Sequence, residues 1–522
     1  MIPAATTHRR LVRAAGLAAA VFFLVLVARF WHPVYGFTSL IQLDGTNDDL
    51  KITAFREHPV FVYPGAAGYD GLYYAQIAYD PTLRSPELPR AMDNFAYRAR
   101  RILPPALAWI FAAGQPAWIV HVYSLLNVAA WLVLAALLWR LLAVADGRGR
   151  LAWAGVLFSA GALASVRLAL TDLVALTILT GALLAAERGK NSWASGTLAA
   201  AALARETSLV AFVGLVERPW FSWKNLLRAL AAVAPLAAWL AYVRWRAGAA
   251  DQGWSNFTLP VVGLVEKFRD ALVALFTVGD KLLAWTTLLA TVGLTVQAAF
   301  FLTHWRLEDR WWRIGAAYAV MLLCLGTAVW EGYPGAATRV LLPLTLAFNV
   351  LVHRTRAPVV WLFAGNLAVF SGLLALRDVP RDPRELAAAH SQGVAAIARL
   401  GDGWFGREHT FKHEWFWASA RGTLALESWP KARASAVELE LKLRSLPPRR
   451  VTIRQNGREI SHADIDANKM MSWSVPLRVT DGHATLEFST DTPGVRENTN
   501  AGARTLAFAL YDPRLVVTEK QP

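Results

Sequence analysis

Cysteine is nearly absent from this chain of 522 residues, because Cys324 is the only one. An intrachain disulfide is therefore excluded, whatever the redox state of the compartment. No histidine, cysteine or carboxylate spacing typical of a metal site is present either. The acids Asp48 and Asp49 are adjacent, and no Asp-x-Asp pair occurs near them. The sequence thus predicts no certain cofactor, and a divalent metal is left open without support.

Acidic residues are also scarce: 38 carboxylates face 53 lysines and arginines, which gives a net charge of +15. A basic chain of this kind sometimes binds nucleic acid. Here the basic residues lie between the hydrophobic runs and do not form one continuous basic surface, so we predict no nucleic-acid partner. Cytoplasmic loops rich in arginine and lysine account for much of the excess.

Long apolar runs dominate the chain, and 55% of all residues are hydrophobic. Runs of nearly bilayer-spanning length recur, which predicts a polytopic membrane protein in contact with lipid. The 23 tryptophans suit the aromatic belts found at membrane interfaces.

The first apolar run, residues 14–31, follows Arg9, Arg10 and Arg13 and so resembles a secretion signal. No small-x-small cleavage site follows it. We predict a retained first span with a cytoplasmic N-terminus.

Further apolar runs predict the remaining spans, and the basic loops orient them. The stretch 192–216 fits this orientation only as two short helices broken near Arg205 and Glu206, a break that is tolerated where it lines a cavity. The count is then about eleven crossings, with the C-terminal tail outside. The predicted spans after the first are 116–139, 151–170, 172–186, 192–216, 226–243, 282–303, 314–330, 338–352 and 358–376.

Two apolar segments are not predicted to span. Residues 264–278 place apolar side chains on one face and Lys267 among the polar ones, which indicates an amphipathic helix on the outer surface. Residues 102–113 are short and contain Pro104 and Pro105, which suits a helix that dips into the membrane.

The composition changes near residue 377. Apolar and polar residues alternate over 437–443, and Asn456-Gly457 is a hairpin signal. The sequence predicts three parts: a multi-span membrane domain at 1–376, with a first outer loop at 32–115, then a linker at 377–400, and finally a periplasmic β-sandwich at 401–522. Its tryptophans could stack on sugars, although core packing suits most of them better. They are Trp404, Trp415, Trp417, Trp429 and Trp473.

Charged residues from distant segments converge on the outer side in this topology. Charge at a membrane edge is costly and marks candidate functional sites. Carboxylates suit a general base and arginines suit a phosphate, so a base, a phosphate and a membrane together suggest a lipid-phosphate sugar donor. The catalytic candidates are Asp70, Asp80 and Asp93; the phosphate-binding candidates are Arg98, Arg101, Arg205 and Arg339; the supporting candidates are Tyr69, Tyr73, Arg167, Asp172, Glu206 and Glu331.

Each candidate also has a structural alternative. Asp70 could pair with a nearby arginine, Asp80 could be a turn residue before Pro81, and Asp93 could cap the helix leading to Arg101. The arginines of the first outer loop could extend to lipid headgroups. Ion pairs could join Arg167 to Asp172, Arg205 to Glu206, and Arg339 to Glu331.

Several segments together resemble bacterial multi-span proteins linked to cell-surface glycopolymer formation, which look like relatives of the GT-C glycosyltransferases. The segments that carry the resemblance are 69–74, 93–98, 101–104, 170–172, 204–207, 339–344, 403–404 and 504–510. The resemblance covers almost the whole chain. The segments together indicate this group of proteins more specifically than any single motif does.

This resemblance implies a GT-C fold that uses a polyprenyl-phosphate-linked sugar, with a glycan, lipid or protein as acceptor. It also implies that an acid of the first outer loop serves as base, and Asp70 occupies the matching position. The chain departs from the common pattern of closely paired acids, because Gly71 follows Asp70. The second acid is then Asp80, Asp93 or absent.

Three functions therefore compete. The first is an inverting glycosyltransferase on the outer face of a bacterial inner membrane. The second is a transporter or flippase of a lipid-linked saccharide, which needs the arginines and no base; internal repeats would favour it, and the chain has no convincing repeat. The third is a non-catalytic scaffold for glycopolymer assembly that anchors a sugar-binding tail.

Overall fold

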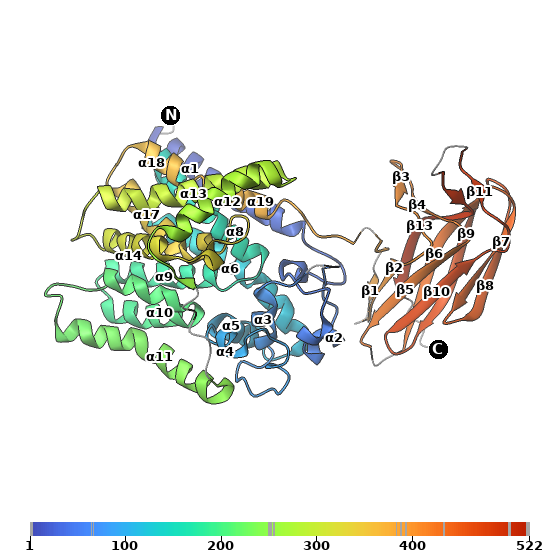
Figure 1. Cartoon of the computed structure of the whole chain (residues 1–522), viewed down its shortest axis with the longest axis horizontal. Coiled ribbons are helices and arrows are strands. Elements are labelled where there is room, and N and C mark those ends of the chain that lie inside the picture. The colour runs from blue at the N-terminus through green and yellow to red at the C-terminus, as the bar shows by residue number, and fades with distance from the viewer. Residues whose placement is uncertain are drawn as a thin grey trace. The chain divides into compact units, whose positions relative to one another are not determined.

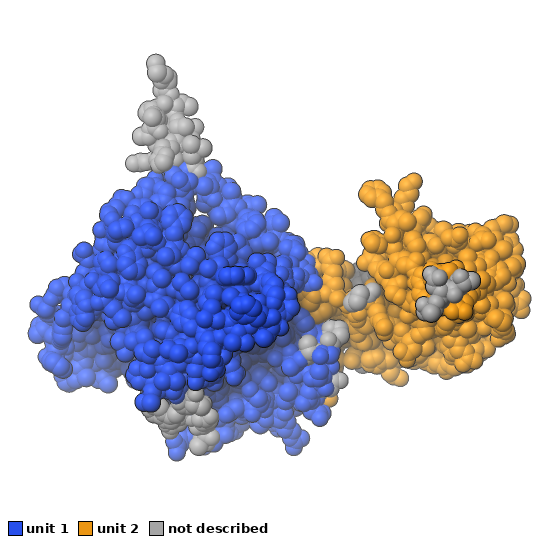
Figure 2. All heavy atoms as spheres, turned by 45° about the horizontal axis from the view of Figure 1, so that its top comes forward, with its two compact units in different colours: residues 1–30, 37–52, 62–379 blue, residues 31–36, 53–61, 380–522 orange. Residues whose placement is uncertain are grey.

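The structure is a computed structural model that describes residues 4–63, 65, 67–248, 253, 256–382, 384–386, 389–391, 394–431, 434–498 and 503–517. Contacts divide the chain into two compact units, which Figure 2 draws in different colours. The helical unit comprises residues 1–30, 37–52 and 62–379, and the β unit comprises residues 31–36, 53–61 and 380–522.

Helices make up the first three quarters of the chain, as the blue to yellow ribbon of Figure 1 shows. The helices up to residue 167 are α1 (Ala4–Ala28), η1 (Thr38–Leu40), η2 (Asp48–Leu50), α2 (Thr53–Glu57), α3 (Gly71–Ile77), α4 (Phe95–Arg98), α5 (Leu103–Phe111), α6 (Pro116–Leu141), α7 (Gly147–Leu157) and α8 (Ala160–Arg167). The later ones are α9 (Asp172–Glu187), α10 (Asn191–Ala204), η3 (Glu206–Gly214), α11 (Trp223–Ala247), α12 (Val262–Thr277), α13 (Lys281–Thr303), α14 (Arg310–Cys324), α15 (Thr327–Trp330), α16 (Ala337–Val340), α17 (Leu342–Arg354), α18 (Val359–Gly365) and α19 (Ala368–Ala375).

Local sequence explains where several of these helices begin. Asp146, Ser159, Ser222, Asp280 and Asp309 each accept a hydrogen bond from a backbone N–H of the first turn of α7, α8, α11, α13 and α14. A side-chain cap of this kind satisfies a donor that the helix itself leaves unpaired. The helices then continue through residues rich in alanine and leucine, which have high helix propensity.

The predicted break in the stretch 192–216 is present. Helix α10 ends at Ala204, Arg205 adopts an extended backbone with φ −155° and ψ 118°, and the 3-10 helix η3 starts at Glu206. The break exposes the side chains of Arg205 and Glu206 to a cavity instead of the helix surface, which gives the two adjacent charges different partners.

Among the described residues, three helices are long and apolar enough to cross a membrane: α6, α11 and α13. The bent pair α7–α8, which turns by 42°, would make a fourth. Helix α11 has only 17% of its most apolar window buried inside the protein, so its apolar side chains face outward. An exposed apolar surface of this kind suits lipid. The other predicted crossings coincide with shorter or interrupted helices, and the count of about eleven stays a prediction.

The β unit contains two sheets, drawn in orange and red in Figure 1. One sheet has the order β1-β2-β5-β10-β7-β8, the other has the order β3-β4-β13-β6-β9, and β11 pairs with β12. The strands are β1 (Ala389–Ser391), β2 (Val394–Leu400), β3 (Glu408–His409), β4 (Glu414–Ala418), β5 (Arg421–Trp429), β6 (Ser435–Ser445), β7 (Arg449–Gln455), β8 (Arg458–Ile465), β9 (Met470–Val479), β10 (His483–Ser489), β11 (Val495–Arg496), β12 (Thr505–Leu506) and β13 (Phe508–Val517).

Alternating burial along the strands produces the core between the sheets. In β6, Val437, Leu439, Leu441 and Leu443 are buried and their neighbours are more exposed, as the sequence pattern predicted. The predicted hairpin at Asn456-Gly457 is confirmed, since both residues have positive φ and join β7 to β8. The sheet begins before residue 401, because β1 and β2 lie inside the segment 377–400 that the sequence assigned to a linker.

Two short pieces of the predicted first outer loop belong to the β unit. His32 Nε2 lies 3.0 Å from Glu385 Oε1, and Arg399 Nη2 donates to the Tyr35 hydroxyl at 2.6 Å. Segments 31–36 and 53–61 thus pack with the sandwich, although the sequence placed them with the spans.

Candidate active site

One pocket of about 530 Å³ in the helical unit collects charged residues from distant segments. Its polar lining comes from the first outer loop, from the α10–η3 break, and from α16. The charged and aromatic lining residues are Tyr69, Asp70, Tyr97, Arg98, Arg100, Arg101, Arg205, Glu206, Phe257 and Arg339. Five arginines and two carboxylates therefore line it, which favours an anionic ligand.

Asp70 occupies the N-cap position of α3, and Arg98 lies between it and a second acid. Arg98 Nη1 is 2.9 Å from Asp70 Oδ1. The same guanidinium donates from Nε and Nη2 to both oxygens of Asp93, at 3.0 and 2.6 Å. Burial opposes ionisation of Asp93, but the hydrogen bonds and charge of Arg98 outweigh it and lower the pKa of Asp93. Arg98 thus orients Asp70, while Asp93 makes the closer ion pair with the same guanidinium.

Gly71, directly after Asp70, is required by close packing. A Cβ at this position would lie 2.1 Å from the carbonyl oxygen of Leu168, just after α8. Only glycine allows α3 to approach α8 this closely. Close packing therefore explains why position 71, where the common pattern has a second acid, holds a glycine in this chain.

Asp172 joins two arginines of the pocket. It is almost fully buried, with Arg205 Nη1 2.9 Å from Oδ1 and Arg339 Nη1 3.7 Å from Oδ2. Neither Asp172 oxygen accepts a hydrogen bond of good geometry from the described residues, and Arg205 Nε also has no partner among them. Arg339 Nη2 donates to the Tyr69 hydroxyl at 2.7 Å. The two guanidinium groups keep donors available for a ligand.

Arg101 and Glu206 form the third charged pair. Arg101 Nε and Nη2 each lie 3.1 Å from an oxygen of Glu206, which is the bidentate geometry of a strong pair. Arg101 Nη1 also donates to the Tyr74 hydroxyl at 2.6 Å. Arg101 is 4% exposed, so its role in the pocket wall is mostly to hold Glu206 and Tyr74 in place.

Three predicted site residues lie away from this pocket. The carboxylate of Asp80 accepts hydrogen bonds from the backbone N–H groups of Thr82, Arg84 and Ser85, as a turn residue does. Arg167 donates to the carbonyl of Ser39 and to the Tyr63 hydroxyl.

Glu331 is the third, and it lines a different cavity. Tyr73 lies beneath the Arg98 guanidinium, 4.8 Å from it, and is not part of the lining.

The ion pairs differ from the three alternatives that the sequence suggested. Asp172 pairs with Arg205 and Arg339 instead of Arg167, and Glu206 pairs with Arg101 instead of its neighbour Arg205. Adjacent residues at a helix break point in different directions, so proximity in sequence was a poor guide.

Several lining residues were not predicted, among them Tyr97, Asn256, Phe257 and Met321. Phe257 forms a β-bridge with Leu325, and Asn256 O accepts from Gly326 N at 2.7 Å. The bridge brings the loop before α12 to the end of α14, a contact that no local pattern signals. Tyr97 could have been found, because it lies between Asp93 and Arg101 in the predicted cluster.

No three histidine, cysteine or carboxylate side chains lie close enough to hold a metal ion in the part of the chain that the structure describes. The pocket is instead dominated by guanidinium groups, whose planar donors match phosphate oxygens.

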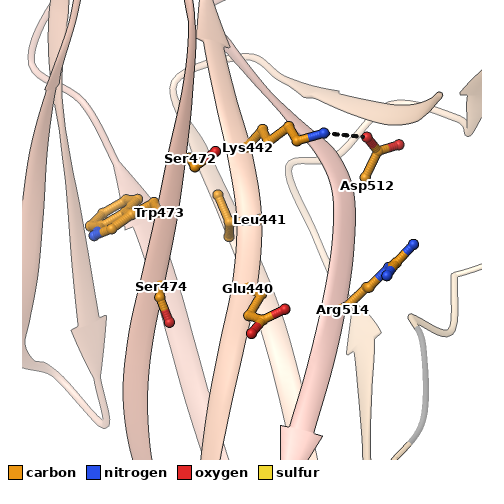
Figure 3. A pocket seen from close by; sticks show the side chains of 8 residues that line it. All are labelled: Glu440, Leu441, Lys442, Ser472, Trp473, Ser474, Asp512 and Arg514. Carbon is orange, nitrogen blue, oxygen red and sulfur yellow. Dashed lines mark hydrogen bonds and ion pairs between the residues drawn. The ribbon is translucent and has the colours of Figure 1, made fainter.

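The β unit has a separate groove of about 440 Å³ on β6, β9 and β13, shown in Figure 3. Glu440, Lys442, Asp512 and Arg514 alternate in charge along it, and Lys442 Nζ lies 3.3 Å from Asp512 Oδ2. Trp473 is the only one of the five candidate tryptophans among the lining residues described.

All five tryptophans serve packing to different degrees, and Trp473 itself packs against the core between the sheets. Trp417 and Trp429 are buried, at 6% exposure each. Trp404 packs against the sandwich core, and Trp415 stacks on Tyr511 with 5.1 Å between ring centroids.

Comparisons with known proteins identify no family. No family model matches the sequence. No curated protein matches it either. The solved structures that match this chain include that of the arabinosyltransferase EmbB from Mycobacterium smegmatis, with a TM-score of 0.27 and 11% sequence identity. That match covers 96% of this chain, and this chain spans about 64% of the length of the other. At such a TM-score the likeness supports no inference about the site.

Proposed function

We propose that this chain is a membrane glycosyltransferase of the GT-C type. It moves a sugar from a polyprenyl-phosphate donor to a glycan, lipid or protein acceptor of the cell surface. The observation that carries the proposal is the convergence of Asp70 with Arg98, Arg205 and Arg339 on one pocket of about 530 Å³. A base and several phosphate-binding groups are the parts that this transfer needs.

Asp70 is the proposed general base. Its carboxylate takes the proton of an acceptor hydroxyl, and the acceptor oxygen forms a bond to the anomeric carbon of the donor sugar. The bond from that carbon to the donor phosphate oxygen breaks, and its electron pair leaves with the phosphate. Attack opposite to the leaving group inverts the anomeric configuration. Arg98, 2.9 Å from Asp70, holds the carboxylate in position.

Arg205 and Arg339 are the proposed ligands of the leaving phosphate. Both line the pocket, and both retain donors because they share the single carboxylate of Asp172. As the sugar leaves, charge builds on the phosphate oxygens, and guanidinium donors fixed in a buried site stabilise it without reorganisation. Asp93 and Asp80 have other partners, so we assign Asp70 alone the role of base.

The proposed setting is the outer face of a bacterial inner membrane. About eleven crossings put the N-terminus in the cytoplasm and the β unit in the periplasm, because the basic loops then stay inside. The outward-facing apolar side chains of α11 support a lipid environment. In this orientation the pocket opens where lipid-linked sugars and cell-surface acceptors meet.

We also propose that the β unit binds a glycan in the groove of Figure 3. Paired charges such as Lys442 and Asp512, together with the hydroxyls of Ser472 and Ser474, can hydrogen-bond a neutral sugar. Trp473 packs against the sandwich core, so the described lining offers no aromatic platform to a sugar, and we expect weak binding that serves to retain the acceptor.

The test is transfer by the purified chain reconstituted in proteoliposomes, with a panel of polyprenyl-phosphate sugars and an extract of cell-surface glycans. Release of free polyprenyl phosphate from at least one donor, dependent on Arg205 and Arg339, is the expected result. Movement of labelled lipid-linked saccharide across the bilayer without any release would instead establish the transporter. Absence of both, with glycan retained by the β unit, would favour the scaffold.

A further inference from the structure

A second, smaller cavity of about 160 Å³ lies in the helical unit between α12, α13, α15 and the loop that follows α15. Its buried lining residues are Lys267, Ala271, Thr287 and Trp330. Asp270, Glu331 and Tyr333 are exposed at its rim. The sequence pattern put Lys267 on the polar face of an amphipathic helix, whereas the structure buries it.

Lys267 is a buried cation that forms no ion pair with a carboxylate of the described residues, although the charge of Asp270 acts on it. Its side chain is 6% exposed, and its only hydrogen-bond acceptor among the described residues is the carbonyl of Gly332, 2.7 Å from Nζ. An ammonium carries three donors, so two are left for a ligand. Burial lowers the pKa of Lys267 to about 8, which agrees with a charge that lacks compensation.

Trp330 also lines this cavity and carries a donor without a partner among the described residues. It is 2% exposed, and its indole Nε1 has no hydrogen-bond partner among the residues that the structure describes. Buried indole N–H groups normally have an acceptor, because leaving one unpaired costs free energy. The cavity lining thus holds two buried donor-bearing side chains from different elements, Lys267 and Trp330, which favours a hydrogen-bond acceptor as the ligand.

The acids at the rim do not fill this role. Asp270 is exposed and lies 2.9 Å from Arg269 Nη2, which balances its charge. Glu331 is also exposed to solvent. The charge in the buried part of the cavity is thus positive, and the acceptor that suits it is an oxyanion.

Helix α12 places this cavity beside an apolar surface. Val265, Leu272, Val273 and Phe276 are exposed, at 60%, 49%, 51% and 84%. Exposed apolar residues on an amphipathic helix suit the membrane interface, where phosphate headgroups lie. Basic pockets between membrane helices are known to accept such headgroups.

We propose that this cavity is a binding site for one phosphate-type oxyanion, held by Lys267 Nζ and Trp330 Nε1. The site is separate from the proposed active site, whose lining takes Ala328 and Val329 of α15 while this cavity takes Thr327 and Trp330. It goes beyond the proposed function and does not depend on it. The phosphate is that of an anionic lipid headgroup or a free phosphate.

The experiment uses the full chain in lipid nanodiscs and measures the thermal unfolding midpoint and tryptophan fluorescence. In one arm, inorganic phosphate is titrated into nanodiscs of phosphatidylcholine. In the other arm, phosphatidylglycerol replaces part of the phosphatidylcholine without added phosphate. A response in the first arm identifies free phosphate, and a response confined to the second identifies the lipid headgroup.

Two variants test the named donors. Lys267→Met removes the cation, and Trp330→Phe keeps the aromatic bulk while removing the indole N–H. We expect binding at least tenfold weaker in Lys267→Met and several-fold weaker in Trp330→Phe. Lys281→Met, an exposed lysine at the start of α13, is the matched control and should bind as the unchanged chain does.

The proposal fails if neither phosphate nor phosphatidylglycerol changes the unfolding midpoint or the fluorescence of the unchanged chain. It also fails if Lys267→Met and Trp330→Phe both respond as strongly as the control. Because Trp330→Phe is nearly isosteric, its unfolding midpoint without ligand separates loss of binding from loss of folding.

Discussion

Arg98 contacts the carboxylates of both Asp70 and Asp93. These contacts distinguish the roles of two acids that were equivalent in the sequence. Asp70 faces the pocket and takes one nitrogen of Arg98, whereas Asp93 takes the bidentate contact. The carboxylate of Asp80 accepts backbone hydrogen bonds from Arg84 and Ser85 within a turn. The three acids lie within one loop, and only their hydrogen bonds show which of them is available for proton transfer.

At the residue scale, Arg339→Lys should weaken transfer by roughly tenfold to a hundredfold, because lysine cannot make two parallel hydrogen bonds to phosphate. The loss should appear mainly in KM for the donor if Arg339 binds the ground state, and in kcat if it binds the leaving phosphate. Steady-state release of polyprenyl phosphate measures both. Arg218→Lys, at an exposed pair with Glu308, is the control.

The prediction also has a clear failure. Unchanged kinetics in Arg339→Lys, with a normal unfolding midpoint, would remove Arg339 from the donor site. A simple loss of stability is distinguished by the midpoint itself, since Arg339 is buried beside Asp172.

A lysine with a lowered pKa makes stability depend on pH. In the folded state Lys267 loses its proton near pH 8, whereas in the unfolded state it does so near 10.5. Between these values the unfolded state binds more protons, so stability gained from this group rises with pH. The acidic groups that face Lys267 across the cavity are Asp270 and Glu331.

The unfolding midpoint of the unchanged chain, minus that of Lys267→Met, should therefore increase from pH 8 to pH 10 in neutral lipid without phosphate. Thermal unfolding in matched buffers measures the difference. A difference that stays flat or falls would show that Lys267 is not a desolvated cation.

At the scale of elements, the sequence predicted well those features that depend on local pattern. The bounds of α6, α9 and α13 follow apolar runs, the α10–η3 break follows from charge and loop orientation, and β6 follows from alternation. Each of these features can be predicted from the hydrophobicity or the charge of the local sequence. The count of membrane crossings is a sum over many shorter helices, and it stays a prediction.

What the sequence could not supply was the set of contacts between distant elements. The Asp172–Arg339 and Arg101–Glu206 pairs join residues more than a hundred positions apart. Lys267 of α12 donates a hydrogen bond to the carbonyl of Gly332, in the loop that follows α15. No periodicity encodes such contacts, so the sequence could not predict which of these residues pair with one another.

The contact between α3 and α8 is the element on which Asp70 depends. Gly71→Ala would put a Cβ 2.1 Å from the backbone oxygen of Leu168, so one of the two elements must shift. We expect a loss of about 1–3 kcal/mol of stability together with strongly reduced transfer. Thermal unfolding and the release assay measure the two effects on the same protein sample.

Gly181→Ala is the matched control for this change, because a Cβ there meets nothing within 4 Å. It lies inside α9, where alanine is the better helix former, and should be neutral or slightly stabilising. If Gly71→Ala were as stable and active as Gly181→Ala, the close approach of α3 to α8 would not be required.

At the scale of the whole molecule, the proposed function requires one orientation of the chain in the membrane, with the pocket and the β unit on the periplasmic side. An alkaline phosphatase fused after residue 522 should be active in a bacterial host, because the enzyme folds only in the periplasm. The same enzyme inserted after Arg188 should be inactive, since that basic loop is predicted to be cytoplasmic. Fluorescent protein fusions at the same two positions should show the opposite pattern.

A periplasmic signal at both positions, or at neither, would contradict the predicted orientation. It would also put the pocket on the wrong side for a cell-surface acceptor. Both fusions leave the pocket residues unchanged, so a failure here is independent of the chemistry at Asp70.

The most direct test of the central claim is Asp70→Asn in the reconstituted chain, assayed for release of polyprenyl phosphate from the donor that the unchanged chain uses. Asparagine keeps the size of the side chain and removes the base, so we predict a loss of about 10²–10⁴-fold with a normal unfolding midpoint. Asp80→Asn, in its turn outside the pocket, should stay within a few-fold of the unchanged chain. Full activity in Asp70→Asn would contradict the account.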